Sequence, residues 1–254
     1  MLGLQVVGTI VLAVALVLLG RWPALSLGQI PLAIALSVTG VAGILFLYRG
    51  LALGPIAVVS PIGAAYVAVA VLLVLGFVGE RLAPGQAVGI GITFLGILLT
   101  ATDGRSLAKA LSRPIPGVWF ALVAMLALGG WSAVMAYGTR SQDGLTLILL
   151  QRVISATVLV VVLAARRGLT VRLDGRIAWL VVASGTLDTL ANVLFVLGVQ
   201  SGSAAIVATA SGAYPMVTTL LAIVLLRERL APNQYLGVVV LLAGLVTLGA
   251  VAGS

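Results

Sequence analysis

A single carboxylate lies in the middle of a long apolar segment, where a charged side chain is rare. Asp188 is near the middle of an apolar stretch that runs from about 177 to 199. A charge at the centre of a membrane-spanning helix costs at least ~2.5 kcal/mol unless it is paired, protonated or in contact with water. Such a group could bind a polar solute, or take up and release a proton. The alternative is a structural carboxyl that accepts hydrogen bonds from the nearby hydroxyls of Thr186 and Thr189.

Two more polar side chains are expected at a similar depth. Arg152 lies about two turns, or ~10 Å, into the apolar stretch from 145 to 165. Because consecutive antiparallel helices would bring Asp188 to nearly the same depth, the spacing predicts an ion pair that lines a cavity. The alternative for Arg152 is a side chain that extends its charge to the membrane surface. Asn192 follows Asp188 by one turn and shares its face, so it could contact a solute or form a hydrogen bond between helices.

Another set of candidates consists of aromatic and proline residues. Tyr66 and Tyr214 occupy corresponding positions of an internal repeat, which suggests that they face each other across its twofold axis. Pro215 follows one tyrosine and Pro61 precedes the other, so both helices are expected to bend and to expose backbone carbonyls that could bind a solute or form a hinge. Trp131 follows two glycines and is a candidate of the same kind. In the alternative interpretation, the tyrosines only pack.

Other chemistry is excluded by residue types that the sequence lacks. There is no cysteine and no histidine, which excludes zinc sites, thiol nucleophiles and Ser-His-Asp triads. There is also no nucleotide-binding loop, so direct use of ATP is not expected. The net charge of +8 comes from basic residues beside apolar segments, which indicates contacts with phospholipid headgroups rather than nucleic acid. We expect no enzyme activity, no cofactor and no metal, with membrane lipids and a small-molecule substrate as partners.

The composition indicates which kind of secondary structure must position these residues. Hydrophobic residues make up 62% of the chain and charged residues 8%, which is too little polar surface for a soluble globule. A helix needs ~20 apolar residues to cross a hydrocarbon core ~30 Å thick. The sequence therefore predicts an all-α, polytopic membrane protein of about nine transmembrane helices. The expected segments are 3–20, 32–50, 56–78, 85–102, 117–138, 145–165, 177–199, 203–226 and 233–251.

The chain also repeats itself at an offset of 148 residues. Positions 63–86 align without gaps on positions 211–234. We place a first repeat of four helices at 1–113 and a second of five helices at 114–254. Because the segment 117–138 has no counterpart, the first repeat is expected to lack its first helix. A unit of five helices reverses its orientation on the second pass, so the predicted arrangement is an inverted pair (4+5), as in many secondary transporters.

The repeat draws attention to charged residues at helix ends. Glu80 and Arg81 in the first repeat correspond to Glu228 and Arg229 in the second, and each pair precedes a proline that suits the first turn of the next helix. We interpret them as anchors at the membrane surface, with helix capping and local ion pairing favoured over contact with substrate.

Paired glycines mark helix faces in the same way. Gly89 and Gly96 are seven residues apart, as are their counterparts Gly237 and Gly244. Each pair lies on one face, where another backbone could approach closely. The sequence leaves two interpretations open, which are packing inside one chain and the seam of a homodimer.

These motifs resemble those of a known family. The second repeat contains Ser211-Gly212-Ala213-Tyr214-Pro215, then Arg227-Glu228-Arg229-Leu230 and Gln234, and the first contains Tyr48-Arg49-Gly50, then Gly79-Glu80-Arg81-Leu82 and Gln86. The pattern resembles EamA-type proteins of the drug/metabolite transporter superfamily over nearly the whole chain. Two departures are the absent first helix and Val67, where the second repeat has Pro215.

The resemblance implies a function and a location. It implies ten helices in two inverted repeats around a central cavity, and a secondary transporter that exports small metabolites or drugs from bacteria by alternating access, with protons as a candidate coupling ion. The expected location is the bacterial cytoplasmic (inner) membrane. Basic loops favour Met1 in the cytoplasm and Ser254 outside, whereas the resemblance implies a cytoplasmic C-terminus. The alternative functions are a flippase for lipid-linked substrates and a non-transporting partner subunit.

Overall fold

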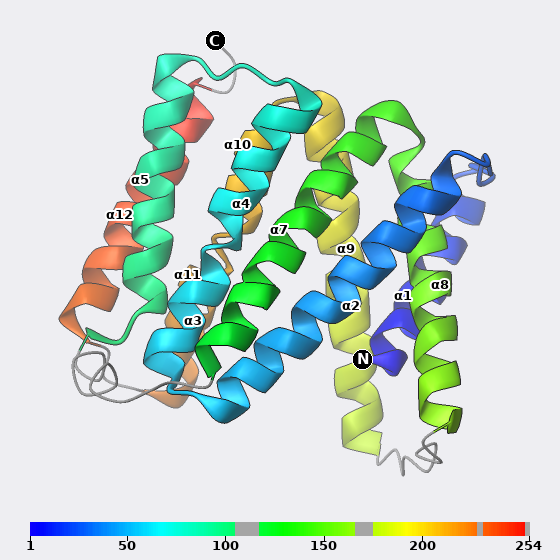
Figure 1. Ribbon diagram of the computed structural model, residues 1–254, viewed down its shortest axis with the longest axis horizontal. Helices are drawn as coiled ribbons and strands as arrows, with labels where there is room; N and C mark the ends of the chain where they lie inside the picture. Colours follow the sequence, from blue (N-terminus) through cyan, green and yellow to red (C-terminus); the bar gives the residue numbers. More distant parts are fainter. Residues whose placement is uncertain (105–116, 166–174, 228–230, 252–254) are drawn as a thin grey trace. The chain divides into compact units, whose positions relative to one another are not determined.

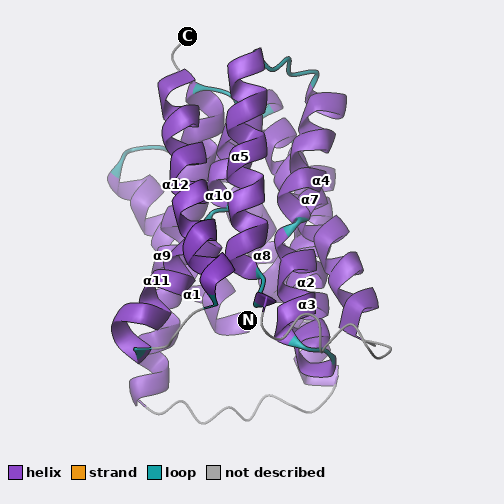
Figure 2. Cartoon of the chain, turned by 90° about the vertical axis from the view of Figure 1, so that its left-hand side faces the viewer, coloured by secondary structure: helices purple, strands orange, loops and turns teal. Residues whose placement is uncertain are grey.

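Every regular element of the described structure is a helix, as Figures 1 and 2 show. The computed structural model describes residues 1–104, 117–165, 175–227 and 231–251. The helices are α1 (Leu2–Leu18), α2 (Gln29–Leu53), α3 (Ile56–Ala64), α4 (Tyr66–Leu73), the π-helix η1 (Val74–Val78), α5 (Pro84–Ala101), α7 (Gly117–Ser141), α8 (Gly144–Ala165), α9 (Gly175–Ser201), α10 (Ala204–Ser211), α11 (Tyr214–Leu226) and α12 (Pro232–Val251).

The lengths of these helices suit a membrane. Among the described residues, eight helical stretches are long and apolar enough to span it, where α3, α4 and η1 form one stretch and α10 with α11 another. The first helix, α1, is also apolar but has 17 residues, or ~25 Å at 1.5 Å per residue, which is near the lower limit for a span. The prediction of an all-α polytopic membrane protein is confirmed, with eight candidate spans and a shorter α1 in the nine predicted places.

Two of the spans are interrupted at corresponding positions. α3 gives way to α4 at Ala65, and α10 gives way to α11 at Gly212 and Ala213. In the second case Pro215 lies in the first turn of α11, where proline is tolerated because it needs no N–H there, and where it cannot continue the hydrogen bonding of the preceding helix. In the first case Pro61 lies inside α3, one turn before the break. The interruptions thus coincide with the two bends expected from the sequence.

The end of the first interrupted span contains a π-helical turn that the sequence did not predict. α4 continues into the π-helical turn η1, and Gly79 closes it with a φ of 72°. Glycine adopts this left-handed conformation without steric cost, so it can terminate the helix and redirect the chain. The following residue, Glu80, is thereby placed beside another helix, as described below.

Contacts divide the chain into two compact units. Unit 1 contains Met1–Val38 and Val134–Gln200, and unit 2 contains Thr39–Ala133 and Ser201–Ser254. Each unit therefore takes helices from both of the repeats predicted at 1–113 and 114–254. The reason is that corresponding helices pack against each other, α1 on α8 in unit 1 and α5 on α12 in unit 2.

The four repeat-related glycines lie in the contact between α5 and α12. A Cβ added to Gly96 would overlap the backbone nitrogen of Leu241, and one added to Gly237 would lie 2.5 Å from the backbone nitrogen of Thr100. Gly89 and Gly244 meet α12 and α5 in the same close way. Because only a hydrogen atom separates the two backbones at these points, a larger residue would force the helices apart. In this structure the glycine faces pack within one chain.

Candidate functional site

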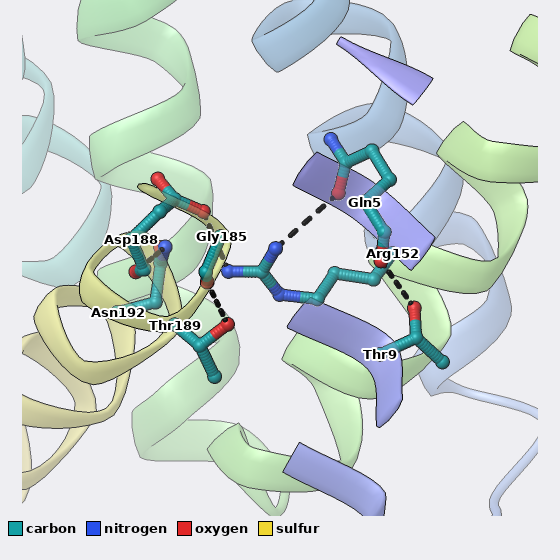
Figure 3. A network of polar contacts seen from close by, with 7 residues as sticks. All are labelled: Gln5, Thr9, Arg152, Gly185, Asp188, Thr189 and Asn192. Carbon is teal, nitrogen blue, oxygen red and sulfur yellow. Dashed lines mark hydrogen bonds and ion pairs between the residues drawn. The ribbon is translucent and has the colours of Figure 1, made fainter. Parts of the chain in front are cut away.

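Arg152 enters unit 1 from α8 with its charged end enclosed by protein. Its side chain is 3% exposed, and its Nη2 lies 2.7 Å from Oδ2 of Asp188 on α9 (Figure 3). The two side chains thus form the ion pair that their depths predicted. The alternative of an arginine that extends to the membrane surface is wrong for this structure, because the guanidinium is buried between helices.

The remaining donors of the guanidinium are only partly used. Nη1 of Arg152 lies 3.5 Å from Oε1 of Gln5 on α1, at the outer limit of a hydrogen bond. The backbone carbonyl of Gln5 in turn accepts a 2.7 Å hydrogen bond from the hydroxyl of Thr9 (Figure 3). Nε of Arg152 is buried and has no hydrogen-bond partner within the described parts of the chain. Of its five N–H donors, the guanidinium therefore makes one short contact, and that contact is with Asp188.

Asp188 is far more exposed than its partner, because 52% of its side chain is exposed. The hydroxyls of Thr186 and Thr189 do not reach the carboxylate and donate instead to the carbonyls of Val182 and Gly185, at 2.8 and 2.7 Å. The alternative of a carboxyl satisfied by these two hydroxyls is therefore wrong. Within the described structure, the short hydrogen bond of the carboxylate is the one that it accepts from Arg152. A charged group that is half exposed at mid-helix must contact water or another polar group, since hydrocarbon would penalise it strongly.

Asn192 lies one turn after Asp188 on the same helix, and its amide group is turned back to the backbone. Its Nδ2 donates a 2.7 Å hydrogen bond to the carbonyl oxygen of Asp188 (Figure 3). This bond lies within α9, and so does not join two helices as one interpretation of the sequence expected. This bond uses one of the two N–H groups of the amide, so the side chain still offers one N–H donor and its carbonyl oxygen to a third group. Asp188 and Asn192 together present carboxylate and amide oxygens as acceptors and one amide donor.

Three residues of this cluster were not predicted as site residues. Gln5 and Gly8 belong to α1, and Ser155 lies one turn after Arg152 on α8, with a buried hydroxyl that lacks a partner in the described structure. The one available signal was Gln5, which is a polar residue in an otherwise apolar segment. The sequence does not show that α1 packs against α8 and α9, so the contact with Arg152 could not be inferred.

The aromatic and proline candidates lie in unit 2. Tyr66 and Tyr214 are the first residues of α4 and α11, directly after the two interruptions. Pro215 is buried beside Tyr214, and Trp131 is half-buried on α7. A Cβ on the neighbouring Gly129 would lie 2.9 Å from the carbonyl oxygen of Tyr66, so α7 crosses α4 closely at this point. Their contact with a solute stays a prediction.

Glu80 has a structural partner on another helix. Its carboxylate accepts a hydrogen bond from the hydroxyl of Ser203 and a 3.0 Å bond from the first backbone N–H of α10. A carboxylate at this place satisfies a free N–H and complements the positive end of the helix dipole. Arg81 is exposed. The counterparts Glu228 and Arg229 lie outside the described residues.

The described residues offer no arrangement for a metal ion. No group of three or more histidine, cysteine or acidic side chains comes together in the parts of the chain that the structure covers. The chemistry available at the site is therefore that of a guanidinium, a carboxylate and an amide. These groups can form hydrogen bonds and ionic contacts with a polar solute.

Comparisons with known proteins agree with this description. The model of the EamA-like transporter family matches residues 2–102 and 115–250. A solved structure described as "Crystal structure of protein" superimposes with a TM-score of 0.76 at 20% sequence identity, and the match covers 99% of this chain and 87% of that chain. At this identity the likeness concerns the fold alone. No curated protein matches the chain.

Proposed function

Because the chain belongs to the EamA-like transporter family, and so is a membrane transporter of the drug/metabolite type, we propose that it is a secondary transporter that exports small metabolites or drugs by alternating access. We further propose the cytoplasmic membrane of a bacterium as its location. The family is one of transporters rather than enzymes. The resemblance suggested by the motifs around Tyr214 and Glu80 is thus confirmed at the level of the family.

The observation that supports a transport site is the asymmetric burial of the ion pair. Arg152 is enclosed at 3% exposure, whereas its partner Asp188 is 52% exposed in the middle of a membrane-spanning helix. A carboxylate needed only for structure would be expected to be buried with its arginine, because exposure to hydrocarbon is costly. The exposed side of Asp188 is therefore proposed to face a solute pathway that contains water.

The pair can support transport in a specific way. Arg152 balances the charge of Asp188, so the carboxylate can stay ionised inside the membrane and accept hydrogen bonds from a solute. The carbonyl oxygen of Asn192 provides a second acceptor on the same face of α9. If Asp188 takes up a proton, the contact with Arg152 weakens, and the two helices that carry the pair gain freedom to move. This step would couple a proton to the movement of the solute.

The test compares what leaves the cell. Media from cells that express the unaltered protein, Asp188→Asn, or no protein are profiled without preselecting a solute, with the amount of folded protein in the membrane measured in each case. We expect one class of small solutes to accumulate outside only with the unaltered protein. The matched control is Thr186→Val, which removes an exposed hydroxyl that bonds only within α9, two residues from Asp188.

Two results would contradict the proposal. If the medium with the unaltered protein equals the medium without protein, export of native metabolites is refuted. If export continues undiminished in Asp188→Asn, transport stands but Asp188 has no part in it. A loss in Thr186→Val as large as in Asp188→Asn would show that the assay reports on folding of α9 rather than on the charge.

A further inference from the structure

A gap in α1 lies directly against the guanidinium of Arg152. Gly8 is buried in the middle of α1. A Cβ built on Gly8 would overlap Nη1 of Arg152 and would lie 2.7 Å from its Cζ and 2.7 Å from Oγ1 of Thr189. A Cβ atom does not approach other heavy atoms to less than 3.0 Å. The volume that a side chain at Gly8 would need is therefore the volume that the guanidinium occupies.

We propose that Gly8 is a positioning residue for the ion pair. By leaving α1 without a side chain at this point, it lets the side chain of Arg152 pass from α8 to Asp188 on α9 while all three helices stay packed. Gly8 need not touch the solute, because it acts through Arg152. The consequence for export rests on the proposed function, whereas the steric relation between Gly8 and Arg152 does not.

The composition of α1 supports this role. Glycine weakens the interior of a helix relative to alanine, so a mid-helix glycine calls for a reason in packing or function. The helix contains one other glycine, Gly3, that faces α9, and a Cβ there would lie 2.7 Å from Cγ1 of Val181. A Cβ on either glycine would thus lie 2.7 Å from a side-chain atom of α9, but only the one on Gly8 would also meet the guanidinium of Arg152 on α8.

The internal repeat gives a second, independent argument. Under the offset of 148 residues, α1 corresponds to α8, and the two helices pack against each other in unit 1. Gly8 corresponds to Ala156, and Arg152 corresponds to Leu4. The repeats therefore differ at both positions of this contact. α1 has no side chain at Gly8 where α8 has alanine, and α8 has the long side chain of Arg152 where α1 has leucine. The space left at Gly8 is the space that Arg152 fills.

A methyl group at position 8 should therefore affect the ion pair more than the fold. Two of the three atoms that a methyl would meet, Nη1 and Cζ, are at the end of a long side chain that can shift, and the third is the hydroxyl oxygen of Thr189, whose side chain can change rotamer. The helix backbones can therefore keep their places. Because the guanidinium is enclosed by protein, its room to shift is small, and movement away from α1 changes its distance to Asp188. A displacement of about 1 Å at a binding site can reduce turnover by up to ~100-fold.

The first experiment measures thermal unfolding and needs no ligand. Gly8→Ala and Gly3→Ala are each made in the unaltered full chain and in Arg152→Met, whose side chain ends before the positions of the Cζ and Nη1 atoms that a methyl would meet. We expect the change in Tm caused by Gly8→Ala to be less favourable in the unaltered chain than in Arg152→Met by about 3 °C or more. Gly3→Ala should change Tm equally in the two backgrounds. An equal effect of Gly8→Ala in both backgrounds would overturn the proposal.

The second experiment measures export by the comparison of media described above. At equal amounts of folded protein, we expect Gly8→Ala to reduce accumulation outside the cell about tenfold and Gly3→Ala to change it less than about twofold. Equal losses in the two variants would refute a positioning role in transport. If the unaltered protein exports nothing, the proposed function fails, and the unfolding experiment still decides whether Gly8 positions Arg152.

Discussion

The ion pair permits a prediction in which the two partners behave differently. Replacing Asp188 by leucine leaves the guanidinium of Arg152 enclosed, at 3% exposure, without its counter-charge. Removing one partner of a buried pair costs ~3–5 kcal/mol. Replacing Arg152 by methionine, which keeps the apolar stem without the charged end, leaves a carboxylate that is 52% exposed and can be solvated. For a partner so exposed, we expect a loss of only ~1 kcal/mol. Asp188→Leu should therefore be the more harmful of the two changes.

The assay is thermal unfolding of the purified protein in one detergent at one pH. With ~2–4 °C of Tm per kcal/mol for a chain of this size, Asp188→Leu should lower Tm by at least ~6 °C and Arg152→Met by no more than ~4 °C. The double variant removes the unpaired charge and should be closer to Arg152→Met than to Asp188→Leu. The reasoning would be refuted by equal losses in the two single variants that add in the double variant, because additivity means that the side chains do not interact.

Three further predictions concern the scaffold and are checked by the same unfolding assay. Gly96→Val pushes a side chain into the backbone of α12 and should lower the free energy of unfolding by ~2 kcal/mol or more. Its control is Gly91→Val on the same helix, which meets open space and should be nearly neutral. Similar effects of the two variants would contradict the close packing of α5 and α12. Glu80→Ala removes the acceptor at the start of α10 and should cost ~1–2 kcal/mol, against little change for the exposed Arg81→Ala. Gln5→Leu should cost less than ~1 kcal/mol, because its 3.5 Å contact is at the limit of hydrogen bonding, and a larger loss would mean that it holds the guanidinium.

Much of the fold could be predicted from the sequence, because a membrane imposes simple rules. Helices in lipid must form their backbone hydrogen bonds internally and must be long enough to cross the membrane, so apolar runs identify them.

The ion pair could be predicted for a related reason. Arg152 and Asp188 lie on consecutive helices, so their distances from the shared connection fix their depths. A residue's depth in the membrane is a local property of the sequence.

Contacts between helices distant in the sequence could not be predicted in this way. Gln5 and Gly8 join the cluster only because α1 packs against α8 and α9, which depends on how side chains interlock over the whole unit. The hydroxyl of Thr189 shows the same limit at short range, since its choice of a helix carbonyl over the carboxylate depends on a rotamer. The end of α4 in a π turn at Gly79 also had no clear periodic signal.

The two repeats share much of their scaffold but differ in the charged residues within their apolar segments, and this difference bears on the proposed mechanism. Both contain an interrupted helix and a glycine face, and both place a glutamine that accepts a hydrogen bond from a helix-capping alanine N–H, Gln86 and Gln234. The positions that correspond to Arg152 and Asp188 are instead leucine and glycine. A symmetric scaffold lets the two halves exchange conformations at little cost in free energy, as alternating access requires. Under the proposed function, a charge pair confined to one half would give a solute or a proton different interactions in the two conformations, and only such a difference can shift the equilibrium between them. Moving the pair to the corresponding positions of the first repeat should therefore preserve the fold more readily than the direction or coupling of transport.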